Sequence, residues 1–108
     1  MKKIALTLIL FFVASVSTYA ADMYVEVTNK TGYDIYHLYI SDVGDNEWGE
    51  DVLDVDVLEN GSKVRVDITG YRNPKFDIQA VDEDGDTYTL KNVNVKKYDV
   101  VFTLEDVD

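Results

Sequence analysis

The chain has 108 residues, no cysteine and a formal net charge of −11 at pH 7. The missing cysteine excludes disulfides, cysteine metal sites, a thiol nucleophile and a lipid anchor on an N-terminal Cys. The acidic charge excludes nucleic acid and anionic lipid surfaces as favoured partners and leaves cations, basic proteins and neutral sugars. Aromatic and other apolar residues are spread along the chain, which indicates a folded protein rather than an acidic disordered tail.

The first twenty residues have the layout of a secretory signal peptide. Lys2 and Lys3 give a positive start, residues 4–14 (IALTLILFFVA) are apolar, and Ala20 stands at the expected cleavage position. The apolar run is about half of the 20 or so residues that span a bilayer, so no membrane span is expected in the mature chain. Cleavage would leave residues 21–108, with 8 basic and 21 acidic side chains and a charge of −13. We therefore expect an exported protein, periplasmic or extracellular, with residues 21–108 as a single domain.

The mature chain alternates apolar and polar residues with period two, which predicts β-strands. Asn60–Gly61 and Asp84–Gly85 are hairpin signals, because both residue types tolerate positive φ. Phase slips near Tyr36–His37 and at Lys91–Asn92 indicate β-bulges, and Lys96–Lys97 reads as a turn. The expected strands cover residues 23–28, 33–41, 52–58, 63–68, 76–80, 88–95 and 98–104.

Seven short strands separated by turn signals favour an all-β fold, an antiparallel two-sheet sandwich of immunoglobulin-like architecture. The Cys…Trp…Cys spacing of true immunoglobulin domains is absent, so the prediction concerns architecture alone.

Five short segments follow one another along the chain: N-x-T-G, I-x-x-L-Y-I-S, W-G-x-D-x-L, a Gly turn and a strand ending in D-x-D-G. In this chain they are residues 29–32, 35–41, 48–53, 58–61 and 76–85. Their order resembles that of small exported bacterial β-sandwich proteins. The resemblance implies the fold and the compartment, and it implies no activity, ligand or catalytic residue.

Acidic residues suggest a cation site in two places. Asp82, Asp84 and Asp86 flank a Gly turn, and carboxylates at alternate positions are ligands that calcium prefers. The acidic stretch 42–59 contributes Asp45 and Asp51, which would join the turn if both lay at one end of the sandwich. The alternative is a hairpin tip and a loop whose carboxylates only face water. The expected cofactor is therefore none, or calcium.

Aromatic residues suggest a binding face. Trp48, in a loop flanked by glycines, could stack on a sugar ring or anchor a protein partner, or it could fold back onto the end of the core. The tyrosines could form cross-strand pairs or an exposed binding row. His37, the single histidine, has no neighbouring Cys or His and reads as a hydrogen-bonded or surface residue. Asn29 and Asn60 begin N-x-[S/T] sequons, which we interpret as turns.

An enzyme is disfavoured, because Ser41 and Ser62 lie outside any G-x-S-x-G setting and no metalloprotease or phosphate-loop motif occurs. We expect a non-catalytic binding or interaction module with a protein or glycan partner. The alternatives are a calcium-stabilised acidic domain and a hydrolase or inhibitor with an unrecognised site.

Overall fold

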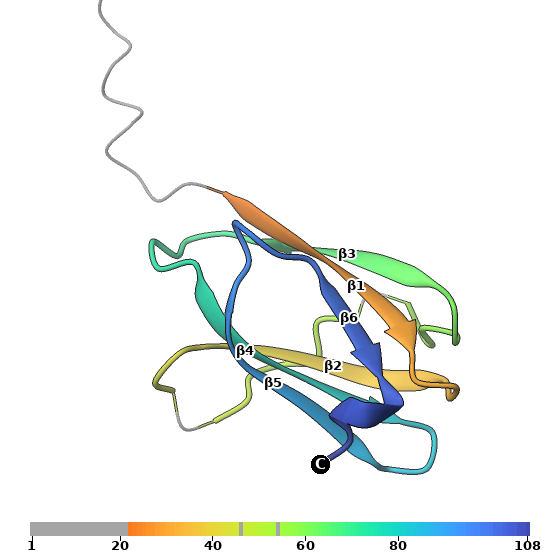
Figure 1. Ribbon diagram of the computed structural model, residues 1–108. Helices are drawn as coiled ribbons and strands as arrows, with labels where there is room; N and C mark the ends of the chain where they lie inside the picture. Colours follow the sequence, from red (N-terminus) through yellow and green to blue (C-terminus); the bar gives the residue numbers. More distant parts are fainter. Residues whose placement is uncertain (1–21, 46, 54) are drawn as a thin grey trace, which may run out of the picture.

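The computed structural model describes residues 22–45, 47–53 and 55–108, so the predicted signal peptide lies outside the described residues. Six β-strands form two three-stranded sheets that pack face to face (Figure 1). One sheet has the order β3-β1-β6 and consists of β1 (Met23–Lys30), β3 (Lys63–Ile68) and β6 (Val100–Thr103). The other has the order β2-β4-β5 and consists of β2 (Ile35–Asp42), β4 (Lys75–Asp82) and β5 (Thr87–Asn94). A 3-10 turn, η3 (Leu104–Asp106), follows β6.

The predicted all-β sandwich of two sheets is confirmed, but its purely antiparallel character is wrong. Strand β6 pairs with β1 in parallel, with Val27 opposite Val100. Parallel strands need a long crossover connection, and here almost the whole described chain separates the two strands. Local hairpin signals cannot report such a pairing.

The predicted strand over residues 52–58 is also wrong for the residues of this range that the structure describes, 52, 53 and 55–58. This segment runs along the outer edge of β2, where the Val52 amide donates to Leu38 O (2.8 Å) and Ile35 exchanges backbone hydrogen bonds with Leu58 (3.0 and 2.8 Å). Between those contacts the Asp51 carboxylate, not a carbonyl, accepts from the Leu38 amide (3.0 Å). Because a side chain takes the place of a ladder partner, the segment protects the sheet edge without continuing the sheet.

The predicted irregularities inside the strands are confirmed. The β2–β4 register shifts between Ile35 and His37. The β4–β5 register shifts opposite residues 76–78, where β5 carries an extra residue and Asn92 takes a positive φ of 59°. The Asp84–Gly85 turn joins β4 to β5 as an antiparallel hairpin. Asn60–Gly61 forms a turn as well, but it leads into β3, which pairs with β1 instead of with residues 52–58.

The core follows the period-two alternation. Each strand except β3 places a fully buried side chain between the sheets, and the Tyr88 and Phe102 rings meet edge-on with centroids 6.4 Å apart. The fully buried apolar members are Val25, Val27, Ile35, Leu38, Phe76, Ile78, Ala80, Tyr88, Val100 and Phe102.

Asn29 ties together the turns at one end of the sandwich. Its side chain is fully buried, and its Nδ2 donates to Tyr33 O (2.7 Å) and Leu58 O (2.9 Å). Its Oδ1 accepts from the amide (3.0 Å) and the hydroxyl (2.8 Å) of Thr31. Buried polar groups need such partners, so the N-x-T-G segment is a structural element. Its Nδ2 is not free to carry a glycan.

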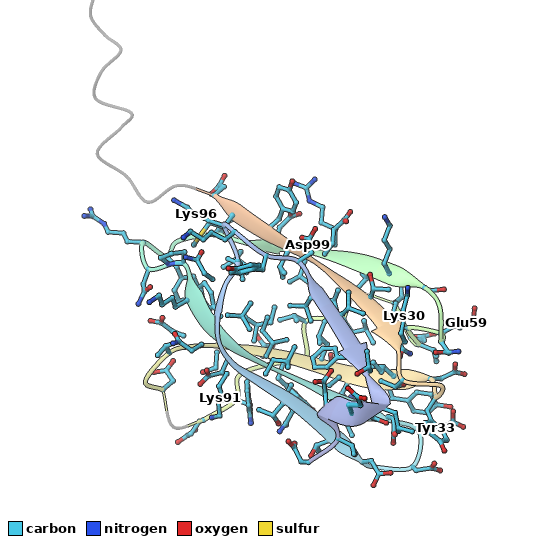
Figure 2. The ribbon with its side chains drawn as sticks, viewed as in Figure 1. Lys30, Tyr33, Glu59, Lys91, Lys96 and Asp99 are labelled. Carbon is cyan, nitrogen blue, oxygen red and sulfur yellow. The ribbon has the colours of Figure 1, made fainter. Side chains whose placement is uncertain are left out.

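The neighbouring turns add further links at this end, which Tyr33 and Glu59 mark in Figure 2. The Asn60 side chain accepts from the Gly32 amide (2.9 Å). The Asp34 side chain accepts from the Asn60 amide (3.2 Å), and the Asp34 amide donates to the Glu83 carboxylate (3.0 Å). We call turns 31–34, 59–62 and 83–86 together the Asn29 end. Several of the five short sequence segments therefore meet there and hold the fold together.

Helices play little part in the described chain. None that it contains is both long and apolar enough to cross a membrane.

Candidate binding site

Asp45 and the Asp82–Asp86 turn lie at opposite ends of the β2-β4-β5 sheet, and Asp51 lies beside the middle of β2. Strand β2 begins with Ile35 opposite Asp82 and ends with Asp42 opposite Phe76. The loop containing Asp45 leaves the Asp42 end, whereas the turn of Asp84 and Asp86 lies at the Asn29 end (Figure 1). The expected meeting of the loop with the turn therefore does not occur. The Asp82–Asp86 turn and the loop are separate candidates.

At the Asn29 end, Asp82 closes the β4–β5 hairpin from inside. It is 3% exposed; its Oδ1 accepts from the amides of Asp84 (2.9 Å) and Asp86 (3.0 Å), and its Oδ2 accepts from Tyr88 Oη (2.8 Å). Burial and the Asp82 hydrogen bond raise the pKa of Tyr88 to about 12. These contacts give Asp82 a structural role that needs no ion.

The same turn still presents a group of three carboxylates. One oxygen each from Asp82, Asp84 and Asp86 lies within 4.8 Å of the others, and Asp84 and Asp86 are exposed. Calcium takes about six to eight oxygen ligands. Three carboxylates, one of them already accepting three hydrogen bonds, supply only part of such a shell.

Asp51 acts on the edge of β2. Its Oδ1 accepts from the amides of Leu38 (3.0 Å) and Leu53 (3.0 Å), and its Oδ2 lies 2.8 Å from His37 Nδ1. Partial burial alone would raise the pKa of the Asp51 carboxyl. The two amides and the His37 ring stabilise the carboxylate more, so its pKa lies below the ordinary value. Asp51 is therefore a structural anchor, and it is not part of the Asp82–Asp86 group.

The His37–Asp51 contact was not anticipated, since the nearest acid in sequence is Asp34. A His–Asp pair can serve a serine nucleophile. Here Ser41 shares the outer face of β2 with His37 but stands four residues further on, roughly 13 Å along a strand. The Ser41 hydroxyl instead donates to Glu47 O (3.2 Å). Within the described chain, the pair therefore supports the sheet edge and has no serine within reach.

Trp48 lies outside the core, on the outer face of the β2-β4-β5 sheet. It is half-buried, and its ring lies 6.4 Å from that of Tyr39, which stacks on His37 at 6.2 Å. The loop that carries it is tied back to β2, because Ser41 donates to Glu47 O and the Asp45 amide donates to Asp42 O (3.0 Å). Trp48 thus does not plug the end of the core, and part of its ring stays accessible.

Beside Trp48 the surface is hollowed. One hollow of about 480 Å³ opens between the end of β2, the loop after it and Tyr71 from the β3–β4 connection. We call it the Trp48 hollow; it is lined by Ile40, Ser41, Asp42, Asp45, Glu47, Trp48, Gly49 and Tyr71. A smaller one of about 60 Å³ shares four of these residues and adds Asp77 and Lys91.

Two features of the Trp48 hollow favour a bound group. Tyr71 is 44% exposed, and its ring is held edge-on against the buried Phe76 ring at 5.3 Å. Asp42 Oδ1 is buried and accepts no hydrogen bond within the described chain. Buried acceptors are rarely left without a donor, and the Asp42 residue belongs to the lining of the hollow.

The sequence pointed to Trp48 and Asp45 but missed Asp42 and Tyr71 as members of one site. Asp42 belonged to the acidic stretch, and its burial could not be inferred from charge. Tyr71 belongs to the β3–β4 connection, and no local sequence pattern predicts that this connection lies beside the end of β2.

Comparison with models of protein families, with curated proteins and with solved structures gives no match. The interpretation of the Trp48 hollow therefore rests on its own geometry.

Proposed function

We propose that this chain is a small exported, non-catalytic binding domain that engages a protein or glycan partner through the Trp48 hollow, in the periplasm or outside the cell. The observation that carries the proposal is the convergence at one place of two accessible aromatic rings and three carboxylates. Ile40, Ser41 and Asp42 of the hollow lie at the end of β2, and the other lining residues come from the following loop and from the β3–β4 connection.

The rest of the proposal comes from the sequence. Residues 1–20 support export through their signal-peptide layout. The five short segments support membership of the small exported bacterial β-sandwich proteins that the sequence resembles. The immunoglobulin-like architecture is also part of the proposal. The two packed sheets favour this architecture, and the parallel β1–β6 pairing is the point at which the topology differs from an all-antiparallel sandwich.

The experiment has two parts. Mass spectrometry of the protein recovered from the exported fraction should give a chain beginning at Ala21. Crosslinking in that fraction should capture a partner with the wild type and with Tyr98→Ala, an exposed tyrosine elsewhere on the surface, and lose it with Trp48→Ala. Equal capture by all three proteins, with unchanged melting temperatures, would refute binding through the hollow.

The calcium-stabilised domain is the second candidate, favoured by the proximity of Asp82, Asp84 and Asp86. The hydrolase or inhibitor alternative gains nothing from the His37–Asp51 pair, because that pair is engaged with the edge of β2.

A further inference from the structure

The Trp48 hollow carries a concentrated negative charge. Asp42, Asp45 and Glu47 line it, and no Lys or Arg does so among the described residues. Asp45 and Glu47 are exposed, so water screens them in part, whereas Oδ1 of Asp42 is buried and has no hydrogen-bond donor among the residues that the structure describes. Like charges gathered in this way repel one another, and a cationic donor in the hollow would relieve the repulsion.

The aromatic rings select among cations. A cation over the face of Trp or Tyr is attracted by the ring, and Trp is the best partner. Tyr39 supports the Trp48 ring at 6.4 Å, and Phe76 supports the Tyr71 ring at 5.3 Å, so both walls are held in place. Calcium would gain nothing from such walls, since it binds oxygen ligands. An organic cation would use both the rings and the carboxylates.

The chain already places one ammonium group beside Trp48. Lys91 lines the smaller hollow together with Trp48 and Asp77, and its Nζ lies 3.6 Å from the Asp77 carboxylate. Figure 2 shows Lys91 reaching from β5 toward the loop that follows β2. The neighbouring, larger hollow offers the same combination of ring and carboxylates without a lysine among its described lining residues.

The size and the mixed lining of the hollow fit a side chain better than an isolated ion. The volume is about 480 Å³, and Ile40, Trp48 and Tyr71 supply the apolar part of the lining. Lys and Arg have apolar stems that pack on such surfaces while the charged head reaches an acceptor. A charge of −13 on residues 21–108 would also steer a basic protein toward the domain.

The geometry points to a specific ligand: the Trp48 hollow receives the guanidinium or ammonium group of an Arg or Lys side chain on a basic partner protein. The head group donates to the exposed carboxylates of Asp45 and Glu47, and it lies between the Trp48 and Tyr71 rings. This inference rests on the proposed function and adds the chemistry of the partner.

Trp48 is the only tryptophan of the chain, so its fluorescence reports binding directly. The purified exported protein is titrated with a short peptide carrying two arginines, with the same peptide carrying citrulline, which is isosteric and neutral, and with free arginine. We expect the arginine peptide to bind at least tenfold more tightly than the other two. Equal binding of the citrulline peptide would overturn the role of charge. Equal binding of free arginine would overturn the assignment to a protein side chain.

Matched double variants separate the site from the general acidity of the protein. Asp45→Asn with Glu47→Gln should raise the Kd of the arginine peptide at least tenfold. Asp84→Asn with Asp86→Asn removes the same charge at the Asn29 end and should change the Kd less than threefold. All four side chains are exposed, and the melting temperature confirms that each variant folds. Equal losses in the two double variants would show diffuse attraction and overturn the inference.

A glycan array distinguishes this inference from the proposed function. Glycan binding that is lost in Trp48→Ala, together with no binding of the arginine peptide, would overturn the inference and retain the binding domain. If neither class of ligand depended on Trp48, both would fail.

Discussion

Replacing Asn29 by Ala should remove much of the stability of the domain. The substitution deletes four side-chain hydrogen bonds, two donated by Nδ2 and two accepted by Oδ1. A typical hydrogen bond contributes about 1 kcal/mol, and buried groups left without partners cost more. Because the Asn29 site is fully buried, we expect a loss of about 3–5 kcal/mol, a large part of the roughly 5–15 kcal/mol of a native domain.

Urea unfolding at pH 7, followed by far-ultraviolet circular dichroism, measures this loss. With a slope of about 1 kcal/mol per molar urea, the midpoint should fall by roughly 3–5 M, or the variant should be unfolded without urea. The control is Asn60→Ala, which removes one exposed hydrogen bond from the Gly32 amide and should cost about 1 kcal/mol or less. If Asn29→Ala were no more destabilising than Asn60→Ala, the structural interpretation of the N-x-T-G segment would be refuted.

The further predictions concern Asp51, Tyr88 and the Asp82–Asp86 turn. The pKa of Asp51 lies below its ordinary value in the folded chain, so its contribution to stability is present above the unfolded pKa of about 4 and is lost as the pH falls through the folded value. Asp51→Asn should therefore flatten the fall in melting temperature below about pH 4, and an unchanged acid profile would count against the anchor. Tyr88, with its pKa raised to about 12, should ionise at a higher pH in the folded protein than in the urea-unfolded protein, and the same ionisation pH in both would contradict its bond to Asp82. The Tyr88 contribution to stability is complete below about pH 10 and is lost as the pH rises toward 12, so Tyr88→Phe should remove that alkaline loss. If the calcium alternative holds, calcium at 100 times its Kd should stabilise the wild type by about 2.7 kcal/mol over a chelator and leave Asp84→Asn unaffected; equal melting temperatures with calcium and chelator would end that alternative.

Strand positions could be predicted because alternation is a local property. Val25 and Val27 face the core and Glu26 does not, as their spacing requires. Both bulges were also visible, since a bulge shifts the phase of the pattern within one strand. These signals need no knowledge of which strands become neighbours.

Pairings between distant segments could not be predicted in the same way. Residues 52–58 alternate like a strand, yet Asp51 replaces the ladder carbonyl opposite Leu38 and the segment remains irregular. The contact of His37 with Asp51 could not be predicted for the same reason. Like the Leu38–Asp51 hydrogen bond, it depends on the path by which the loop after β2 returns along that strand.

The candidate site was predictable only in part. Trp48 and Asp45 stood out as a lone aromatic residue and a carboxylate in one loop. Trp48 and Asp45 share one hollow with Tyr71, and Asp45 lies far along the sheet from Asp82. Both facts depend on the directions of the strands, which the alternation of apolar and polar residues does not reveal.

The central claim is that the Asn29 end maintains the fold while the Trp48 hollow binds the partner. Amide chemical shifts of the isotope-labelled protein, recorded during titration with the arginine peptide, test it most directly. The largest changes should fall on Ser41, Glu47, Gly49 and Tyr71, with little change in turns 31–34, 59–62 and 83–86. Changes concentrated in those three turns, or spread evenly over the acidic surface, would contradict the account.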